Sequence, residues 1–124
     1  AAISPECPII IVDFHAEATS EKMALGWFLD GKISCLVGTH THIQTADERI
    51  LPQGTGYITD LGMVGPWNSV LGVEKEVVVK KFLTGLPVKF SLAGGKIVFW
   101  AIIIEVNDQT GKVIKIERVK KFLD

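Results

Sequence analysis

The chain has 124 residues, a formal net charge of −1 and a hydrophobic content of 48%. This size fits one small domain over residues 1–124, and the composition excludes a disordered chain. The 13 basic and 14 acidic residues nearly cancel, so we expect no specific nucleic-acid binding and no attraction to an anionic membrane. The longest apolar run, 97–104, is also well short of the roughly 20 residues that span a bilayer.

The start of the chain and the two cysteines bear on the cellular location. Residues 1–8 contain no basic residue and no initiator Met, so they do not read as a signal peptide and look like a chain entered partway through. Cys7 and Cys35 can form at most one disulfide bond. Because Cys35 lies in an apolar run, we expect two buried free thiols in a cytoplasmic protein.

The amino-terminal part predicts a strand, a helix and a second strand. Residues 8–14 are apolar and β-branched without alternation, which is typical of a strand buried on both faces. Ser20 is the expected N-cap of a helix that ends near residues 30–31, and residues 33–38 form the second strand. Strands joined by such a helix are expected to be parallel neighbours with a right-handed crossover.

The rest of the chain predicts a β-rich end. The expected elements are two short strands around a turn in 50–60, a loop over 61–69, a helix over 70–83, and a hairpin of strands 96–106 and 112–119 turned by 107–111. Together with the strand–helix–strand unit, these elements predict an α/β fold.

All three histidines of the chain follow the two predicted parallel strands. His15 comes after the first strand, and His40 and His42 come after the second. Parallel neighbours present their carboxyl ends to one crevice, so these rings should converge. Imidazole is a common metal ligand, and an H-x-H pair in extended backbone places both rings on one side. The spacing leaves two interpretations open, a metal site or ordinary polar residues.

The neighbouring residues fit a metal site without deciding for one. Asp13 can orient a histidine ring from behind or cap backbone N–H groups. Glu17 can be a ligand or a base, or a solvated acid near a helix N-terminus. Gly62 and Gly65 can let the chain pass close to a ligand, or simply supply unusual φ angles in a loop.

Three stretches of the sequence resemble the bacterial YmdB-like metallophosphoesterases, a calcineurin-like family. They are V-D-F-H-A-E-A-T-S-E-K at 12–22, G-T-H-T-H-I-Q-T-A-D at 38–47, and T-D-L-G-M-V-G-P at 59–66, the last followed by S-V-L-G at 69–72. The likeness extends over nearly the whole chain, and the first two strings are its most specific parts.

The resemblance implies a metal-dependent phosphodiesterase that hydrolyses cyclic nucleotides or similar small phosphodiesters with metal-activated water. Its site holds two divalent ions, for which Fe, Mn and Zn are equally suitable. In that family the histidine of the D-F-H-A-E string and both histidines of G-T-H-T-H bind metal. The resemblance therefore implies that His15, His40 and His42 are metal ligands here.

The chain departs from the family pattern in one large respect. Family members are much longer, and their amino-terminal half supplies the other ligands, which are an Asp, a Glu and an Asn followed by a catalytic His. Those motifs are absent from this sequence. We therefore expect the carboxyl-terminal half of a calcineurin-like sandwich, completed by the missing amino-terminal half or by a homo-oligomer.

Two other functions stay open for such a half. One is a non-catalytic metal-binding or oligomerisation module, and the other is an inactive fragment. An orphaned half is also expected to expose a large apolar surface.

Overall fold

The strand–helix–strand unit at the start of the chain forms as predicted. The computed structural model describes residues 7–124. In it β1 (Ile11–His15) and β2 (Cys35–Thr39) pair in parallel, and α1 (Thr19–Leu29) connects them. Their register runs from Ile11 opposite Cys35 to His15 opposite Thr39. The carboxyl ends of both strands therefore lie side by side, as the sequence predicts.

The helix begins one residue before the predicted cap. Ala18 has extended backbone angles, and its carbonyl accepts the N–H of Lys22 at 3.3 Å, which closes the first helical turn. Ser20 therefore lies inside α1, and the prediction that it is the N-cap is wrong. The helix ends at Leu29, before Asp30, as expected.

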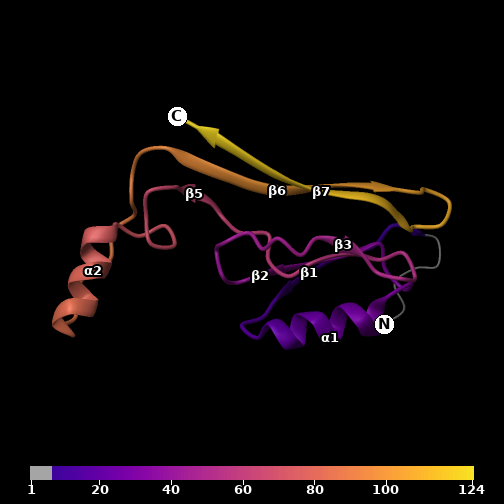
Figure 1. Ribbon diagram of the computed structural model, residues 1–124, viewed down its shortest axis with the longest axis horizontal. Helices are drawn as coiled ribbons and strands as arrows, with labels where there is room; N and C mark the ends of the chain where they lie inside the picture. The colour runs from indigo at the N-terminus through magenta and orange to yellow at the C-terminus, as the bar shows by residue number, and fades with distance from the viewer. Residues whose placement is uncertain (1–6) are drawn as a thin grey trace.

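Two further strands complete the first sheet, and three form a second one. β3 (Arg49–Ile50) and β4 (Gly56–Ile58) are the two predicted short strands, and the sheet has the order β1-β2-β4-β3. The second sheet is antiparallel, and its strand order is β5 (Val64–Pro66), β6 (Ile97–Val106) and β7 (Val113–Leu123). β6 and β7 form the predicted hairpin. Figure 1 shows three layers, with α1 on one side of the first sheet and the β6–β7 hairpin on the other. The predicted α/β fold is confirmed.

Alternation along β2 fills both faces of the first sheet. Leu36 faces α1, whereas Cys35 and Val37 face the second sheet. On the α1 side, the core is Leu36, Leu51 and Tyr57, with Val12, Phe14, Leu25, Leu29 and Ile33 packed against it. On the side of the second sheet, the core is Cys35, Val37, Ile58 and Val113, with Leu61, Ile102, Ile104, Val106 and Ile116 around it.

The first strand is half-buried on one face and exposed on the other, contrary to the prediction of burial on both faces. Val12 and Phe14 pack on the α1 side, while Ile9 and Ile11 are 41% and 49% exposed. The reason is topological, because β1 is an edge strand of the sheet. The prediction of two buried thiols is half wrong for a related reason. Cys7, just before β1, is exposed, whereas burial raises the pKa of Cys35 to about 11.

Two boundaries in the middle of the chain also differ from prediction. The expected loop over 61–69 contains β5 (Val64–Pro66), because these three residues find antiparallel partners in β6, far along the chain. The second helix, α2 (Lys75–Thr84), begins later than residue 70. Val70 and Val73 instead form an isolated β-bridge, with Gly72 between them at a φ of 97°.

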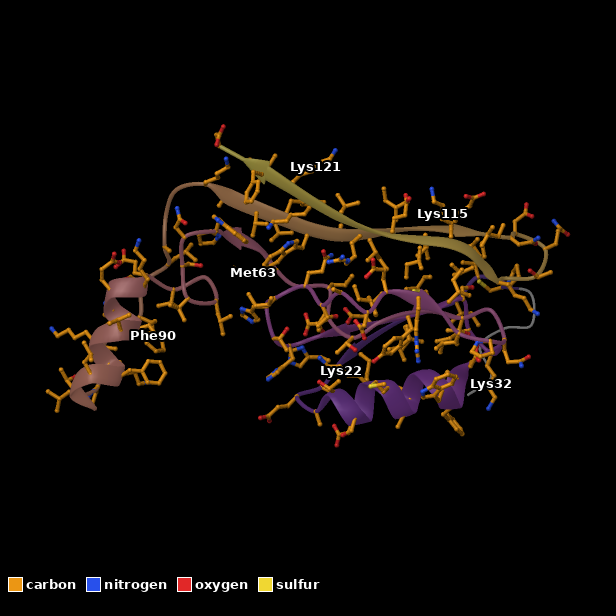
Figure 2. The ribbon with its side chains drawn as sticks, viewed as in Figure 1. Lys22, Lys32, Met63, Phe90, Lys115 and Lys121 are labelled. Carbon is orange, nitrogen blue, oxygen red and sulfur yellow. The ribbon has the colours of Figure 1, made fainter. Side chains whose placement is uncertain are left out.

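Helix α2 projects away from the three layers, as Figure 1 shows. Its side chains Phe82 and Leu83 are 83% and 81% exposed. A shallow apolar groove of about 250 Å³ runs beside it, and Phe90 lies next to the helix (Figure 2). We call this region the α2 apolar surface; it comprises Val70, Leu71, Val73, Val78, Val79, Phe82, Leu83, Leu86, Phe90 and Leu92. The expected large exposed apolar surface is thus present.

Among residues 7–124, neither helix is long and apolar enough to cross a membrane.

Gly38 in β2 lies very close to the backbone of Thr59, the residue that follows β4. A Cβ atom at this position would overlap the backbone oxygen of Thr59 and would lie 2.9 Å from Cδ of Lys22. The backbone oxygen cannot move aside without shifting the sheet, so glycine is required by space here.

We expect Gly38→Ala to reduce the free energy of unfolding by more than about 3 kcal/mol, at the upper end of overpacking costs. Urea unfolding followed by circular dichroism measures this. Gly94→Ala is the matched control, because a Cβ there meets nothing within 4 Å, and it should leave stability almost unchanged. Equal stability of the two variants would contradict a steric requirement for glycine at position 38.

Candidate metal site

The ends of β1 and β2 bring two of the three histidines together. His15 is the last residue of β1, and His40 directly follows β2. His15 Nε2 lies 3.2 Å from His40 Nδ1, and the two rings meet edge to face at 74° with centroids 5.1 Å apart. The predicted convergence therefore occurs for this pair.

A chain of hydrogen bonds orients the His15 ring through Nδ1, the ring nitrogen that does not face His40. The hydroxyl of Thr39 donates to Asp13 Oδ1 at 3.3 Å, and Thr39 Oγ1 lies 3.1 Å from His15 Nδ1. Because the Thr39 hydroxyl uses its hydrogen in the bond to Asp13, its oxygen accepts the Nδ1–H of His15. The arrangement favours the tautomer in which Nε2 carries a lone pair facing His40. Asp13 thus acts on the ring through Thr39.

The distance between the two ring nitrogens suits two ligands of one metal ion. Zinc–nitrogen bonds are about 2.0–2.1 Å, and a tetrahedral angle then places two ligand nitrogens about 3.3–3.4 Å apart. The observed 3.2 Å between His15 Nε2 and His40 Nδ1 is close to that value. These two residues therefore fit a divalent transition-metal ion.

The third histidine lies apart from this pair. His42 Nδ1 is 3.2 Å from the carbonyl oxygen of Leu71, in the segment that precedes α2. The φ angles of His40 and His42 are 143° and 64°, so the H-x-H segment is not the extended backbone assumed from sequence. Within residues 7–124, no three His, Cys, Asp or Glu side chains are arranged to hold a metal ion.

The other residues considered from sequence lie near the site or structure its loops. Glu17 is exposed just before α1. Gly62 has a φ of 79°, and a Cβ there would lie 2.5 Å from the Trp100 ring. A Cβ on Gly65 would meet only Met63. Glycine is therefore required at position 62 by its φ angle and by the Trp100 ring, whereas neither backbone angle nor close neighbours require it at position 65.

A buried ion pair beneath the histidine segment was not predicted from sequence. Lys22 Nζ lies 3.2 Å from Asp60 Oδ2, and the two side chains are 1% and 0% exposed. Lys22 extends from α1 toward the sheet (Figure 2), and Asp60 follows β4. The available signal was a lysine in a helix that must pack on a sheet, and both residues lie inside the strings that resemble the family.

Asp60 also accepts two backbone hydrogen bonds. Its Oδ2 accepts the N–H of Thr41 at 2.8 Å, and its Oδ1 accepts the N–H of Gly62 at 2.9 Å. Burial by itself raises the pKa of Asp60, but these hydrogen bonds and Lys22 outweigh it, so the pKa lies below its ordinary value. The carboxylate therefore stays ionised and holds the residue between His40 and His42.

Asp47 fixes the far end of the same loop. It accepts the N–H of Thr59 at 3.1 Å and the hydroxyls of Thr45 and Thr59. Partial burial raises the pKa of Asp47, whereas these hydrogen bonds lower it by more, and the net pKa lies below its ordinary value. Residues 41–47 are thus tied to the end of β4 by two carboxylates.

Comparison with known proteins identifies the class to which this fold and site belong. The family model described as YmdB-like protein matches residues 1–119. The chain is 56% identical over 119 residues to the 2',3'-cyclic-nucleotide 2'-phosphodiesterase of Bacillus subtilis, an alignment that covers 96% of this chain and 45% of that protein. The chain belongs to the YmdB-like family.

Solved structures agree with this assignment. The crystal structure of a novel phosphatase from Mycoplasma pneumoniae matches with a TM-score of 0.89 at 41% identity, over 95% of this chain and 42% of that one. A hypothetical protein from Thermus thermophilus matches with a TM-score of 0.86 at 43% identity, over 93% and 45%. The chain spans less than half the length of these relatives.

The lowered pKa values of Asp47 and Asp60 predict loss of stability in acid. Each group has a lower pKa in the folded chain than in the unfolded chain, so its stabilisation is complete above the unfolded value of about 3.9. That stabilisation disappears as the pH falls from there through the lower folded values. Urea unfolding between pH 7 and pH 2.5 should show this decrease.

Asp47→Asn removes one of the two contributions and should give a shallower decrease below about pH 4. Asp108→Asn, in the exposed hairpin turn, is the matched control and should keep the wild-type profile. A profile for Asp47→Asn that parallels the wild type would show that Asp47 does not stabilise the fold as a carboxylate.

Proposed function

We propose that this chain supplies the histidine part of a dinuclear metal centre in a phosphodiesterase that hydrolyses a cyclic nucleotide or a similar small phosphodiester. The observation that carries the proposal is the His15–His40 pair, 3.2 Å apart and oriented through Thr39, in a YmdB-like chain. The 56% identity to a protein named 2',3'-cyclic-nucleotide 2'-phosphodiesterase supports the substrate class.

His15 and His40 would hold one ion, and His42 would be a further ligand of the centre. When bound, Fe, Mn or Zn ions supply Lewis acidity and an activated water for attack on phosphorus. The chain's own part is to hold and orient imidazoles. Asp13 and Thr39 fix the His15 tautomer, and turning His42 away from the Leu71 carbonyl frees its Nδ1.

The remaining ligands would come from an amino-terminal half. Residues 1–124 would then form the carboxyl-terminal half of one metallophosphoesterase domain, consistent with a chain that spans 45% of its Bacillus subtilis relative. Two imidazoles alone offer no carboxylate to bridge a second ion. Among the described strands β1 is an edge of its sheet, and this edge and the α2 apolar surface would be available to the missing half or to a second copy.

The metal proposal predicts the effect of removing each histidine from the completed protein. With the amino-terminal half supplied and Mn²⁺ present, His15→Ala, His40→Ala and His42→Ala should each lower hydrolysis of 2',3'-cyclic AMP more than about 100-fold. Loss of a metal ligand should lower the rate by more than the 10–100-fold that is typical when a residue hydrogen-bonded to a ligand is removed. Initial rates and metal content by mass spectrometry measure the two effects together.

Gln109→Ala, in the exposed turn of the β6–β7 hairpin, is the control and should keep the wild-type rate. Unchanged turnover in all three histidine variants would refute the proposal. A completed protein that binds metal without hydrolysing phosphodiesters would instead indicate a non-catalytic metal-binding module. No metal and no hydrolysis would indicate an inactive fragment.

The exposed apolar surface predicts association of the isolated chain. Analytical ultracentrifugation over a range of concentrations should detect dimers or larger species, and Phe82→Ser with Leu83→Ser should weaken that association. Both side chains are more than four-fifths exposed, so the double variant should fold normally. A wild-type chain that stays strictly monomeric at high concentration would show that a second copy does not cover the α2 apolar surface.

A further inference from the structure

We infer that Lys22 and Asp60 are positioning residues of the histidine centre: their buried ion pair fixes the segment that carries His40 and His42 over the ends of β1 and β2. The inference rests on the proposed function for its consequence in metal binding. Its geometric part, which concerns where the rings lie, stands on the ion pair and its hydrogen bonds alone.

The pair joins three parts of the fold at one point. Lys22 comes from α1, Asp60 from the end of β4, and Thr41, whose N–H donates to Asp60 at 2.8 Å, lies between the two histidines. The Lys22 side chain also passes the end of β2, since a Cβ on Gly38 would lie 2.9 Å from its Cδ. A shift of Asp60 must therefore move residue 41.

The side chains of His40 and His42 contact His15 and the Leu71 carbonyl, whereas Asp60 bonds the backbone N–H between the two rings. His40 and His42 have φ angles of 143° and 64°, a backbone that L residues rarely adopt and that needs external support. Thr41 provides it through the Asp60 contact and through its hydroxyl, which bonds the Ile43 carbonyl at 2.9 Å. Of these two contacts, only the one to Asp60 ties the segment to the rest of the molecule.

The charges of the pair matter as well as its shape. Asp60 satisfies three donors, which are Lys22 Nζ and the N–H groups of Thr41 and Gly62. The backbone N–H groups of Thr41 and Gly62 lower the pKa of the buried carboxylate, and Lys22 lowers it further. An ionised carboxylate is a stronger acceptor for backbone N–H groups than a neutral one. We expect Asp60→Asn to weaken the hydrogen bond from the Thr41 N–H. Lys22→Met removes the positive charge beside Asp60 but keeps the hydrogen bonds from the N–H groups of Thr41 and Gly62.

The test compares Asp60→Asn and Lys22→Met with Val113→Ala in the full chain. Val113 is buried in β7 against Gly56, at the opposite end of the first sheet from the histidines, so its variant loses stability without touching the site. Three quantities are measured: the melting temperature, the dissociation constant for Co²⁺ from its visible absorption, and the ¹⁵N spectrum of the imidazole rings without metal.

We expect Asp60→Asn and Lys22→Met to weaken Co²⁺ binding by at least about 10-fold, as is typical for residues that orient metal ligands. Their His15 and His40 ring resonances should also move in the metal-free chain. Val113→Ala, at a similar loss of melting temperature, should keep both the wild-type affinity and the ring spectrum. Lys22→Arg should restore most of the affinity, because it keeps the positive charge.

Two outcomes separate this inference from the proposed function. If the wild-type chain binds no Co²⁺ but Asp60→Asn still shifts the ring resonances, the positioning inference holds, and the metal proposal is decided separately by the histidine variants of the completed protein. If both variants fold and leave the Co²⁺ affinity and the ring spectrum as in the wild type, the positioning inference is overturned.

Hydrogen exchange of the wild-type chain tests the same point if the variants do not fold. The N–H of Thr41 should exchange as slowly as the amides of β2, since its acceptor is buried. Exchange of Thr41 at the rate of the exposed turn 107–110 would overturn the inference.

Discussion

The arrangement of this molecule depends on one buried charge pair, Lys22 with Asp60. Taking a lysine and an aspartate out of water is unfavourable unless the charges meet and the remaining polar atoms are paired. Here the carboxylate has three donors, and they come from α1, from the segment after β2 and from the segment after β4. Removing one partner of such a pair typically costs about 3–5 kcal/mol. The pair therefore couples the packing of α1 on the sheet to the conformation of the chain around the histidines.

The candidate site follows from the same edge of the sheet. Parallel pairing of β1 and β2 places His15 beside Thr39, and the next residue carries the second imidazole. The hydrogen bonds from Thr39 to Asp13 and from Thr41 to Asp60 restrain this edge from two sides. One carboxylate orients a ring, and the other holds the backbone between two rings.

The two apolar features that remain uncovered have different origins. β1 is exposed because it is the last strand of its sheet, so its outer face and its hydrogen-bonding edge have no neighbour in the described part of the chain. α2 is exposed because residues 85–96 carry the chain from it back to β6 without packing it onto either sheet (Figure 1). Apolar side chains as exposed as Phe82 and Leu83 are unfavourable in water and favour association with another surface. Both features therefore offer apolar area that a partner can cover.

The sequence by itself determined the local elements and the neighbourhood of the site. The apolar runs specified β1, β2 and the terminal hairpin, and the βαβ order specified parallel pairing, which is enough to bring His15 and His40 to one edge. Only the tertiary structure decided that Val64–Pro66 pairs with β6, that β1 is an edge strand and that His42 turns toward Leu71. It also decided that Lys22 meets Asp60, 38 residues away. Each of these depends on contacts between segments far apart in the chain, and periodicity within one segment carries no information about them.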